Sequence, residues 1–208
     1  YRERLSTLVT HTGLFMRPMF HAAKAASALA KRVIYAEGED PRVLRAAQMA
    51  LDEGLASPLL IGSPDAIQRR IEELGLHIRI GQDVGVVDPQ DNPHHGSYSE
   101  KYHEIMGREG VSAEAARAIV QRNHSVIAAL AVRMGDADAM VCGLYGSFDK
   151  HLQVVRDVIG LDKDAGIFAA LSAVLLEKHT LFITDTYVNE DPSAEELADI
   201  ARMAALKV

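Results

Sequence analysis

The sequence comprises 208 residues, with 22 Lys and Arg against 29 Asp and Glu, a formal net charge of −7 and 48% hydrophobic residues. This composition is typical of a folded, soluble protein, and the acidic balance with only 5% aromatic residues disfavours a nucleic-acid-binding surface. The single cysteine, Cys142, excludes an internal disulfide and fits a reducing, cytoplasmic compartment, and no apolar run approaches the roughly 18 residues of a membrane span.

The first thirty residues predict a helical connector arm, with short helices on either side of Gly13. The chain opens on Tyr1 rather than Met, and no Gly, Asn or Pro ends the last predicted helix before Val208. We therefore expect a fragment of a longer protein, so that a missing motif would lie outside these residues.

Strand and helix signals alternate from residue 31 onward. Asp40 is a natural N-cap and Pro41 a natural first helical residue, and the apolar face that follows ends at Gly54. The predicted strands cover residues 32–37, 58–61, 77–80, 84–87 and 138–142. Further helices are predicted at 64–74, 98–106, 113–120, 126–134 and from 147 to 159, with a loop at 88–96.

Two apolar runs, 167–176 and 180–184, are separated by a polar turn and are typical of an antiparallel hairpin, although the first run fits a helix equally well. Ser193 and Glu196 have the spacing of a capping box and predict the start of a final helix. Repeated strand–helix pairs predict an α/β fold, a three-layer αβα arrangement with a mainly parallel sheet.

Ligands in open α/β sheets lie beyond the carboxyl ends of the strands, and two predicted loops qualify. The loop 37–41 carries three carboxylates that would repel a phosphate, so we interpret it as an ordinary strand-to-helix turn. The loop 142–150 contains Gly143, Gly146 and Ser147 at a helix start, which suits either an anion site or a helix start that binds nothing.

A third candidate is the segment 184–189, whose Asp, Thr and Asn side chains precede the capped final helix. It suits a ligand rim and plain turn chemistry equally well. His94, His95 and His103 near Asp88 match no standard zinc spacing, so we predict a solvated surface and no metal. Cys142 ends a predicted buried strand, and we interpret it as structural.

Four segments resemble the phosphate acetyl/butyryltransferase family, in the order that the family has them. They are the strand and helix at 32–47, the segments 58–62 and 137–143, and the run from Thr184 to Leu197. Within that family, the arm and residues 157–160 and 181–189 make the chain similar to the C-terminal phosphotransacetylase-like domain of the bacterial hybrid malic enzymes.

This resemblance implies two α/β subdomains of the isocitrate dehydrogenase-like type, with a cleft between them where CoA or acetyl-CoA binds. We expect a connector arm at 1–30, a first subdomain at 31–145, and the start of a second, incomplete subdomain at 146–208. Active transferases of the family usually carry a His/Thr/Ser-rich stretch followed by an arginine. This sequence has Tyr145, Gly146 and Ser147 in that stretch and Gln153 at the arginine position.

An amide in place of a guanidinium removes a bidentate anion contact, so we expect no catalytic residue in this chain. The resemblance implies instead a regulatory and oligomerising domain that senses acetyl-CoA. We expect the rim of its effector site to include Gly146, Ser147, Gln153, Asp185 and Asn189.

The parent protein would then be a cytoplasmic malic enzyme that converts malate to pyruvate, with its NADP and divalent metal (Mg or Mn) bound upstream of this chain. Acetyl-CoA would be the effector and a second copy of the chain the partner, with no nucleic acid, membrane, cofactor or metal bound here. Two alternatives stay open: an active phosphate acetyltransferase, and a purely structural dimerisation module.

Overall fold

The computed structural model describes residues 31–176 and 179–208, and the predicted arm at 1–30 lies outside the described residues. The described chain divides after Gly160 into two compact units. The first of these units includes residues 148–159, which pack against the helix at 124–134. The subdomain boundary expected at 145/146 stays a prediction.

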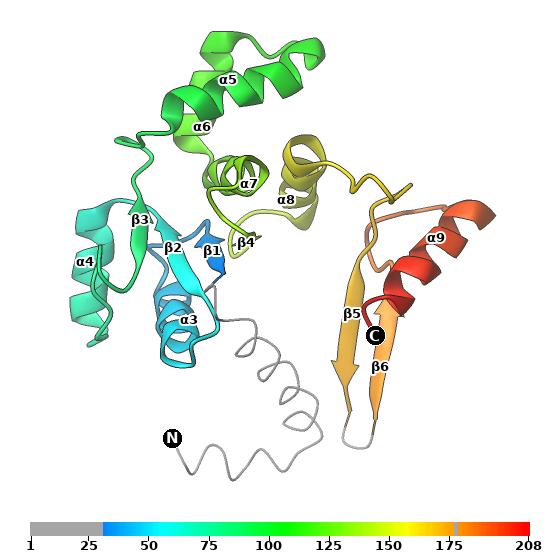
Figure 1. Ribbon diagram of the computed structural model, residues 1–208, viewed down its shortest axis with the longest axis horizontal. Helices are drawn as coiled ribbons and strands as arrows, with labels where there is room; N and C mark the ends of the chain where they lie inside the picture. The colour runs from blue at the N-terminus through cyan, green and yellow to red at the C-terminus, as the bar shows by residue number, and fades with distance from the viewer. Residues whose placement is uncertain (1–30, 177–178) are drawn as a thin grey trace. The chain divides into compact units, whose positions relative to one another are not determined.

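The first unit contains a four-stranded, fully parallel sheet in the order β3-β2-β1-β4 (Figure 1). Its strands are β1 (Arg32–Tyr35), β2 (Ser57–Ile61), β3 (Gly85–Val87) and β4 (Ala139–Val141). Its α-helices are α3 (Pro41–Asp52), α4 (Pro64–Glu73), α5 (His95–Met106), α6 (Ala113–Arg122), α7 (His124–Met134) and α8 (Phe148–Val154). A 3₁₀ turn, η2 (Gly107–Glu109), follows α5, and a π-helical segment, η3 (Val155–Ile159), continues α8.

Neighbouring residues in the strands point to opposite faces and build two separate cores. Ile34 and Ile61 are fully buried against the helices α5, α6 and α7, whereas Tyr35 and Leu60 pack with α3 and α4 on the other face. Helices therefore cover both faces of the sheet, as the alternating pattern predicted, and the three-layer αβα fold is confirmed.

Helix starts follow the predicted capping chemistry. The carboxylate of Asp40 accepts from the backbone N–H of Arg42, with Pro41 in the first turn of α3. Gly54 then adopts a left-handed φ of +64° just after that helix. These features hold the loop after β1 and the start of α3 in a defined geometry.

Three details differ from the sequence prediction. Residues 77–80 form no strand, because only Ile80 bridges to Val84 and the ladder starts at Gly85. Helix α5 begins at His95, inside the predicted loop 88–96, because the side-chain oxygen and the carbonyl of Asn92 accept from the N–H groups of His94 and His95 and turn the chain into the helix.

The third difference concerns β4, which is an edge strand among the strands that the structure describes and is less buried than its apolar sequence predicted. Ala139 and Val141 are exposed, and Val141 retains 48% of its accessible surface. A strand at the edge of the sheet has a neighbour on one side only, so its apolar residues are not enclosed.

The second unit contains an antiparallel hairpin and one helix. Strands β5 (Leu171–Leu175) and β6 (Thr180–Thr184) pair with Ser172 opposite Ile183, which confirms the hairpin alternative over the helix. Helix α9 (Ala194–Ala205) starts with the predicted capping box, in which Ser193 and Glu196 bond each other's backbone N–H groups. Within the described residues, no helix has the length and apolar character needed to cross a membrane.

Candidate functional site

The carboxyl ends of β1, β2 and β3 meet at one edge of the sheet, since all three strands are parallel. The loops that leave these strands are held together by main-chain hydrogen bonds. Gly38 N–H donates to the Ile61 carbonyl at 3.1 Å, and Gly62 N–H donates to the Val87 carbonyl at 3.1 Å. This edge is where an open α/β sheet offers a ligand site.

A cavity of about 280 Å³ lies at that edge. Its walls come from the loops after the three strands and from the corner between α6 and α7. Its polar and charged lining residues are Glu39, Ser63, Asp88, Gln90, Gln121, Arg122 and His124.

Each of the two acidic residues of this cavity uses one carboxylate oxygen to accept a hydrogen bond from a backbone N–H. Glu39 Oε1 accepts from the Ser63 N–H at 2.8 Å, and Asp88 Oδ1 accepts from the Gln90 N–H at 2.9 Å. Each carboxylate therefore has a second oxygen that these loop contacts leave available. Across the cavity, Gln121 Nε2 donates to Gln90 Oε1 at 3.1 Å and joins α6 to the loop after β3.

The corner between α6 and α7 is organised by Asn123. This residue ends α6 and caps α7, where its side-chain oxygen accepts from the Val126 N–H at 3.2 Å. The next residue, His124, contacts the Ala36 carbonyl through Nδ1 at 3.0 Å. Because a carbonyl oxygen only accepts, Nδ1 carries the proton and Nε2 is the ring nitrogen left for another contact.

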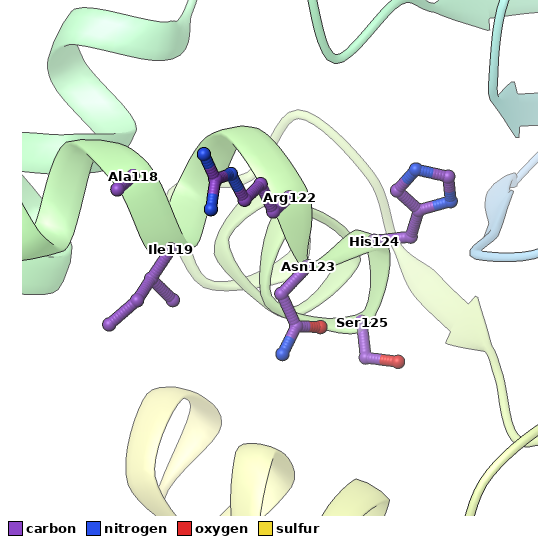
Figure 2. A pocket seen from close by; sticks show the side chains of 6 residues that line it. All are labelled: Ala118, Ile119, Arg122, Asn123, His124 and Ser125. Atoms are coloured by element: carbon purple, nitrogen blue, oxygen red, sulfur yellow. The ribbon is translucent and has the colours of Figure 1, made fainter.

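A second cavity, of about 400 Å³, borders the same corner (Figure 2). Its lining residues are Ala118, Ile119, Arg122, Asn123, His124 and Ser125. Figure 2 shows the Ile119, Asn123 and Ser125 side chains on one side of the corner and Arg122 and His124 on the other. Both cavities are thus lined by Arg122 and His124.

The predicted glycine loop after β4 is fastened to the acidic loop after β1. Glu37 Oε1 accepts from the N–H groups of Gly143 at 2.9 Å and Leu144 at 3.2 Å. The Tyr145 hydroxyl donates to Asp40, and the Arg42 guanidinium lies over the Tyr145 ring at 5.7 Å. The carboxylates of 37–41 therefore hold a neighbouring loop, in addition to forming the predicted turn.

Asp40 is strongly perturbed by the residues around it. Hydrogen bonds from Arg42 first, and from Tyr145 second, hold the pKa of the Asp40 carboxyl well below its usual range, although desolvation opposes the shift. The same contacts raise the pKa of Arg42. The guanidinium of Arg42 is therefore occupied by Asp40 and Tyr145 and is not a free anion-binding group.

A second set of contacts fixes the same loop from the helix side. His151 contacts the Tyr145 carbonyl through Nε2 at 2.6 Å, so that Nδ1 accepts from the hydroxyl of the buried Ser125 at 3.0 Å. Cys142, at the end of β4, is half-buried, and desolvation and the Glu37 charge raise the pKa of its thiol. This pKa disfavours the thiolate and agrees with a structural role.

The structure places three of the five predicted rim residues in the first unit. Gly146 and Ser147 lie in the fastened loop at the start of α8, and Gly146 has a left-handed φ of +96°. Gln153 lies further along α8, where its amide nitrogen donates to Asp157 at 2.6 Å. None of these three lines either cavity described above.

The other two predicted residues, Asp185 and Asn189, lie in the second unit and contact each other. The Asn189 side-chain nitrogen donates to Asp185 Oδ2 at 2.9 Å and to the Phe168 carbonyl at 2.7 Å. Asp185 and Tyr187 both adopt left-handed backbone conformations, with φ of 57° and 66°. The Asn189 hydrogen bonds thus hold a turn with a strained backbone, and Tyr187 in this turn is 90% exposed.

The histidines that raised the zinc hypothesis have separate partners. His95 contacts the Arg117 carbonyl, His103 contacts the Val111 carbonyl, and His94 stacks on Tyr98. In the described part of the chain, no group of three His, Cys, Asp or Glu residues is arranged to hold a metal ion.

Sequence reasoning missed Arg122, His124 and Asn123. Their signal was present, because a polar Arg-Asn-His run separates two predicted helices, 113–120 and 126–134. The sequence argument looks for ligand sites at the carboxyl ends of strands, and this run lies between two helices. The structure shows that this corner lies over the carboxyl edge of the sheet.

A parallel α/β sheet with cavities at its carboxyl edge defines a ligand-binding domain of the open-sheet class. A family model described as phosphate acetyl/butaryl transferase matches residues 14–208. The chain therefore belongs to the phosphate acetyl/butyryltransferase family.

Individual proteins agree with this assignment. The chain is 46% identical over 208 residues to an NAD-dependent malic enzyme of Rhizobium meliloti and 43% identical to an NADP-dependent malic enzyme of Haemophilus influenzae. Each match covers all of this chain but only 27% of the malic enzyme. It is 30% identical to a phosphate acetyltransferase of Synechocystis over 90% of this chain and 26% of that protein.

A solved phosphotransacetylase from Streptococcus pyogenes has the same fold. It superposes with a TM-score of 0.79 at 24% identity, and the match covers 89% of this chain and 56% of that one.

Proposed function

We propose that this chain is the regulatory, acetyl-CoA-sensing and oligomerising domain of a malic enzyme, and that it is not itself a transferase. The observation that carries the proposal is the match to malic enzymes along the whole chain at 43–46% identity, against 30% for the acetyltransferase. The chain accounts for 27% of those malic enzymes, which leaves the rest of the protein for malate oxidation.

The polar groups around the fastened loop support a role without acyl transfer to phosphate. A transferase that handles an acyl phosphate needs cationic groups aimed at the phosphate. At the predicted arginine position, the Gln153 amide is bonded to Asp157. The nearby guanidinium of Arg42 is occupied by Asp40 and Tyr145.

In this proposal, NADP and the divalent metal belong to the remainder of the malic enzyme. The names of the relatives differ in the nucleotide, with NADP for the Haemophilus protein and NAD for the Rhizobium protein, and we propose NADP. The parent would oxidise and decarboxylate malate to pyruvate in the cytoplasm. Acetyl-CoA would act by binding one arrangement of the domains more tightly than another.

The test is a pair of assays on the intact protein that contains this chain. We expect acetyl-CoA to inhibit malate oxidation saturably, and we expect no acetyl phosphate to form from acetyl-CoA and inorganic phosphate. Acetyl phosphate formation at a normal enzymatic rate would favour the active transferase.

A structural dimerisation module is the other alternative. It predicts an oligomer whose malate oxidation is insensitive to acetyl-CoA. Sedimentation of the intact protein with and without acetyl-CoA, run beside the inhibition assay, separates that alternative from a sensing domain.

A further inference from the structure

The two cavities of the first unit meet at Arg122, and this guanidinium has no hydrogen-bond or ion-pair partner among the described residues. Arg122 ends α6 and is exposed, beside a cavity of about 280 Å³ and a cavity of about 400 Å³. A guanidinium offers five N–H donors in a planar fork that suits a phosphate. Its place between two cavities makes it the first candidate for an anion contact.

His124 adds a hydrogen-bond acceptor beside Arg122, because the proton on Nδ1 leaves a lone pair on Nε2 that suits a ligand hydroxyl. Its Nδ1 is bonded to Ala36, so the imidazole is fixed in orientation and Nε2 is available to a ligand. The backbone N–H groups of His124 and Ser125 open helix α7 and have no acceptor in the part of the chain that the structure describes. Both groups favour negative charge beside Arg122.

The opposite wall of the smaller cavity is acidic and selects against a bare phosphate. Glu39 and Asp88 each have one oxygen bonded to a backbone N–H and one left to accept. Carboxylate oxygens accept strongly from sugar hydroxyls, as in the sites that bind the ribose of dinucleotides. A ligand that suits both walls therefore carries a phosphate next to a hydroxyl group.

Size restricts the ligand further. A volume of about 280 Å³ lies just below the usual range for small-molecule sites, so it suits a sugar phosphate better than a whole cofactor. The larger cavity beside it is lined by Ala118 and Ile119 as well as Arg122, and so has room for a less polar part of the same molecule.

We propose that Arg122 and His124, facing Glu39 and Asp88 across this cavity, form a subsite for a phosphorylated ribose. The proposal rests on the proposed function in one respect: CoA, which carries a 3′-phosphate beside a free 2′-hydroxyl, is then the source of that ribose. The same chemistry is present in the 2′-phosphorylated ribose of NADP, and the experiment distinguishes the two sources.

The experiment is isothermal titration of the intact protein with acetyl-CoA, acetyl-dephospho-CoA, NADP and adenosine 3′,5′-bisphosphate. Acetyl-dephospho-CoA lacks only the ribose phosphate, so we expect it to bind about 10- to 100-fold more weakly than acetyl-CoA. The variant Arg122→Gln is expected to weaken acetyl-CoA by a similar factor and to leave acetyl-dephospho-CoA almost unchanged.

Arg117→Gln is the matched control, since Arg117 is exposed on the same helix and lines neither cavity. It should bind all four ligands as the unchanged protein does. Glu39→Gln keeps an oxygen for the Ser63 N–H and removes the charge. It should weaken acetyl-CoA if Glu39 binds the ribose hydroxyl, whereas tighter binding would overturn that assignment.

The outcomes separate the two proposals. Arg122-dependent binding of NADP or the bisphosphate, without binding of acetyl-CoA, would keep the subsite and overturn the proposed effector. Acetyl-CoA binding that Arg122→Gln leaves unchanged, or weakens equally with and without the 3′-phosphate, would overturn the subsite and keep the effector. Failure of all four ligands to bind would overturn both.

Discussion

Glu37 Oε1 lies 2.9 Å from the backbone nitrogen of Gly143, and this contact joins the loop after β1 to the loop after β4. The same oxygen also accepts from the Leu144 N–H at 3.2 Å. Strands β1 and β4 are neighbours in the sheet, so the carboxylate continues their pairing beyond the last ladder residues. Glu37, in the loop after β1, therefore holds the glycine loop in place.

We predict that Glu37→Ala loosens the glycine loop. The substitution removes the acceptor of two exposed N–H groups, which water then solvates, at a cost of about 0.5–1.5 kcal/mol. Amide hydrogen exchange at Gly143 and Leu144 should accelerate accordingly, whereas Glu37→Gln, which keeps a side-chain oxygen, should change it less. Unchanged exchange in Glu37→Ala would contradict the role given to this carboxylate.

The pH dependence of stability should contain a contribution from Asp40. Its pKa is lowered in the folded protein by Arg42 and Tyr145, while the unfolded carboxyl titrates near 3.9. The stabilisation is thus fully present above about pH 5 and is lost as the pH falls through 4 and below.

Thermal unfolding midpoints of the intact protein between pH 7 and pH 3 check this sign. Asp40→Asn should lower the midpoint at pH 7, and the difference from the unchanged protein should shrink toward pH 3. Glu100→Gln, a change of an exposed carboxylate in the middle of α5, is the control. A difference that grows on acidification would be the wrong sign.

Two glycine-to-alanine substitutions should have opposite effects. A Cβ on Gly38 would lie 2.7 Å from the Ile61 carbonyl oxygen and 2.8 Å from its nitrogen, so Gly38→Ala must push β1 and β2 apart where they form the cavity edge. We expect a loss of about 1–3 kcal/mol. A Cβ on Gly96, in the first turn of α5, meets nothing within 4 Å, and Gly96→Ala should stabilise by about 0.4–1 kcal/mol.

Thermal unfolding midpoints of the two variants give the comparison directly. A Gly38→Ala protein as stable as the Gly96→Ala protein would show that the backbone contact between the loop after β1 and Ile61 is not close.

Cys142 should react slowly with thiol reagents. Desolvation and the Glu37 charge raise the pKa of the thiol, although a hydrogen bond with Ser125 opposes them. Alkylation by iodoacetamide at pH 7.5 should therefore be slower than for a small-molecule thiol, and Glu37→Gln should accelerate it. A faster reaction than the small thiol in the native protein would show a thiolate and overturn the structural role.

Local chemistry made most of the first unit predictable. Asp40, Pro41 and Gly54 mark the ends of α3 by their own backbone preferences, so their positions follow from sequence alone. The edge position of β4 did not follow, because an apolar strand looks alike at the centre and at the edge of a sheet. Strand order depends on contacts between residues that are far apart in sequence.

The candidate site was predicted less well for the same reason. Gly146 and Ser147 were identified from local patterns. Their loop is held by hydrogen bonds with Glu37 and His151, and a local sequence pattern does not show that these residues contact the loop. Arg122 became a candidate only when the fold placed the α6–α7 corner over the ends of β1 to β3. Residues that come together from several elements are visible only in three dimensions.

The central claim is that this domain binds acetyl-CoA as an effector, and isothermal titration of acetyl-CoA into the intact protein tests it most directly. The account predicts saturable binding with one site per chain, at concentrations that also inhibit malate oxidation. An absence of binding heat at every accessible concentration, with malate oxidation unaffected by acetyl-CoA, would contradict it.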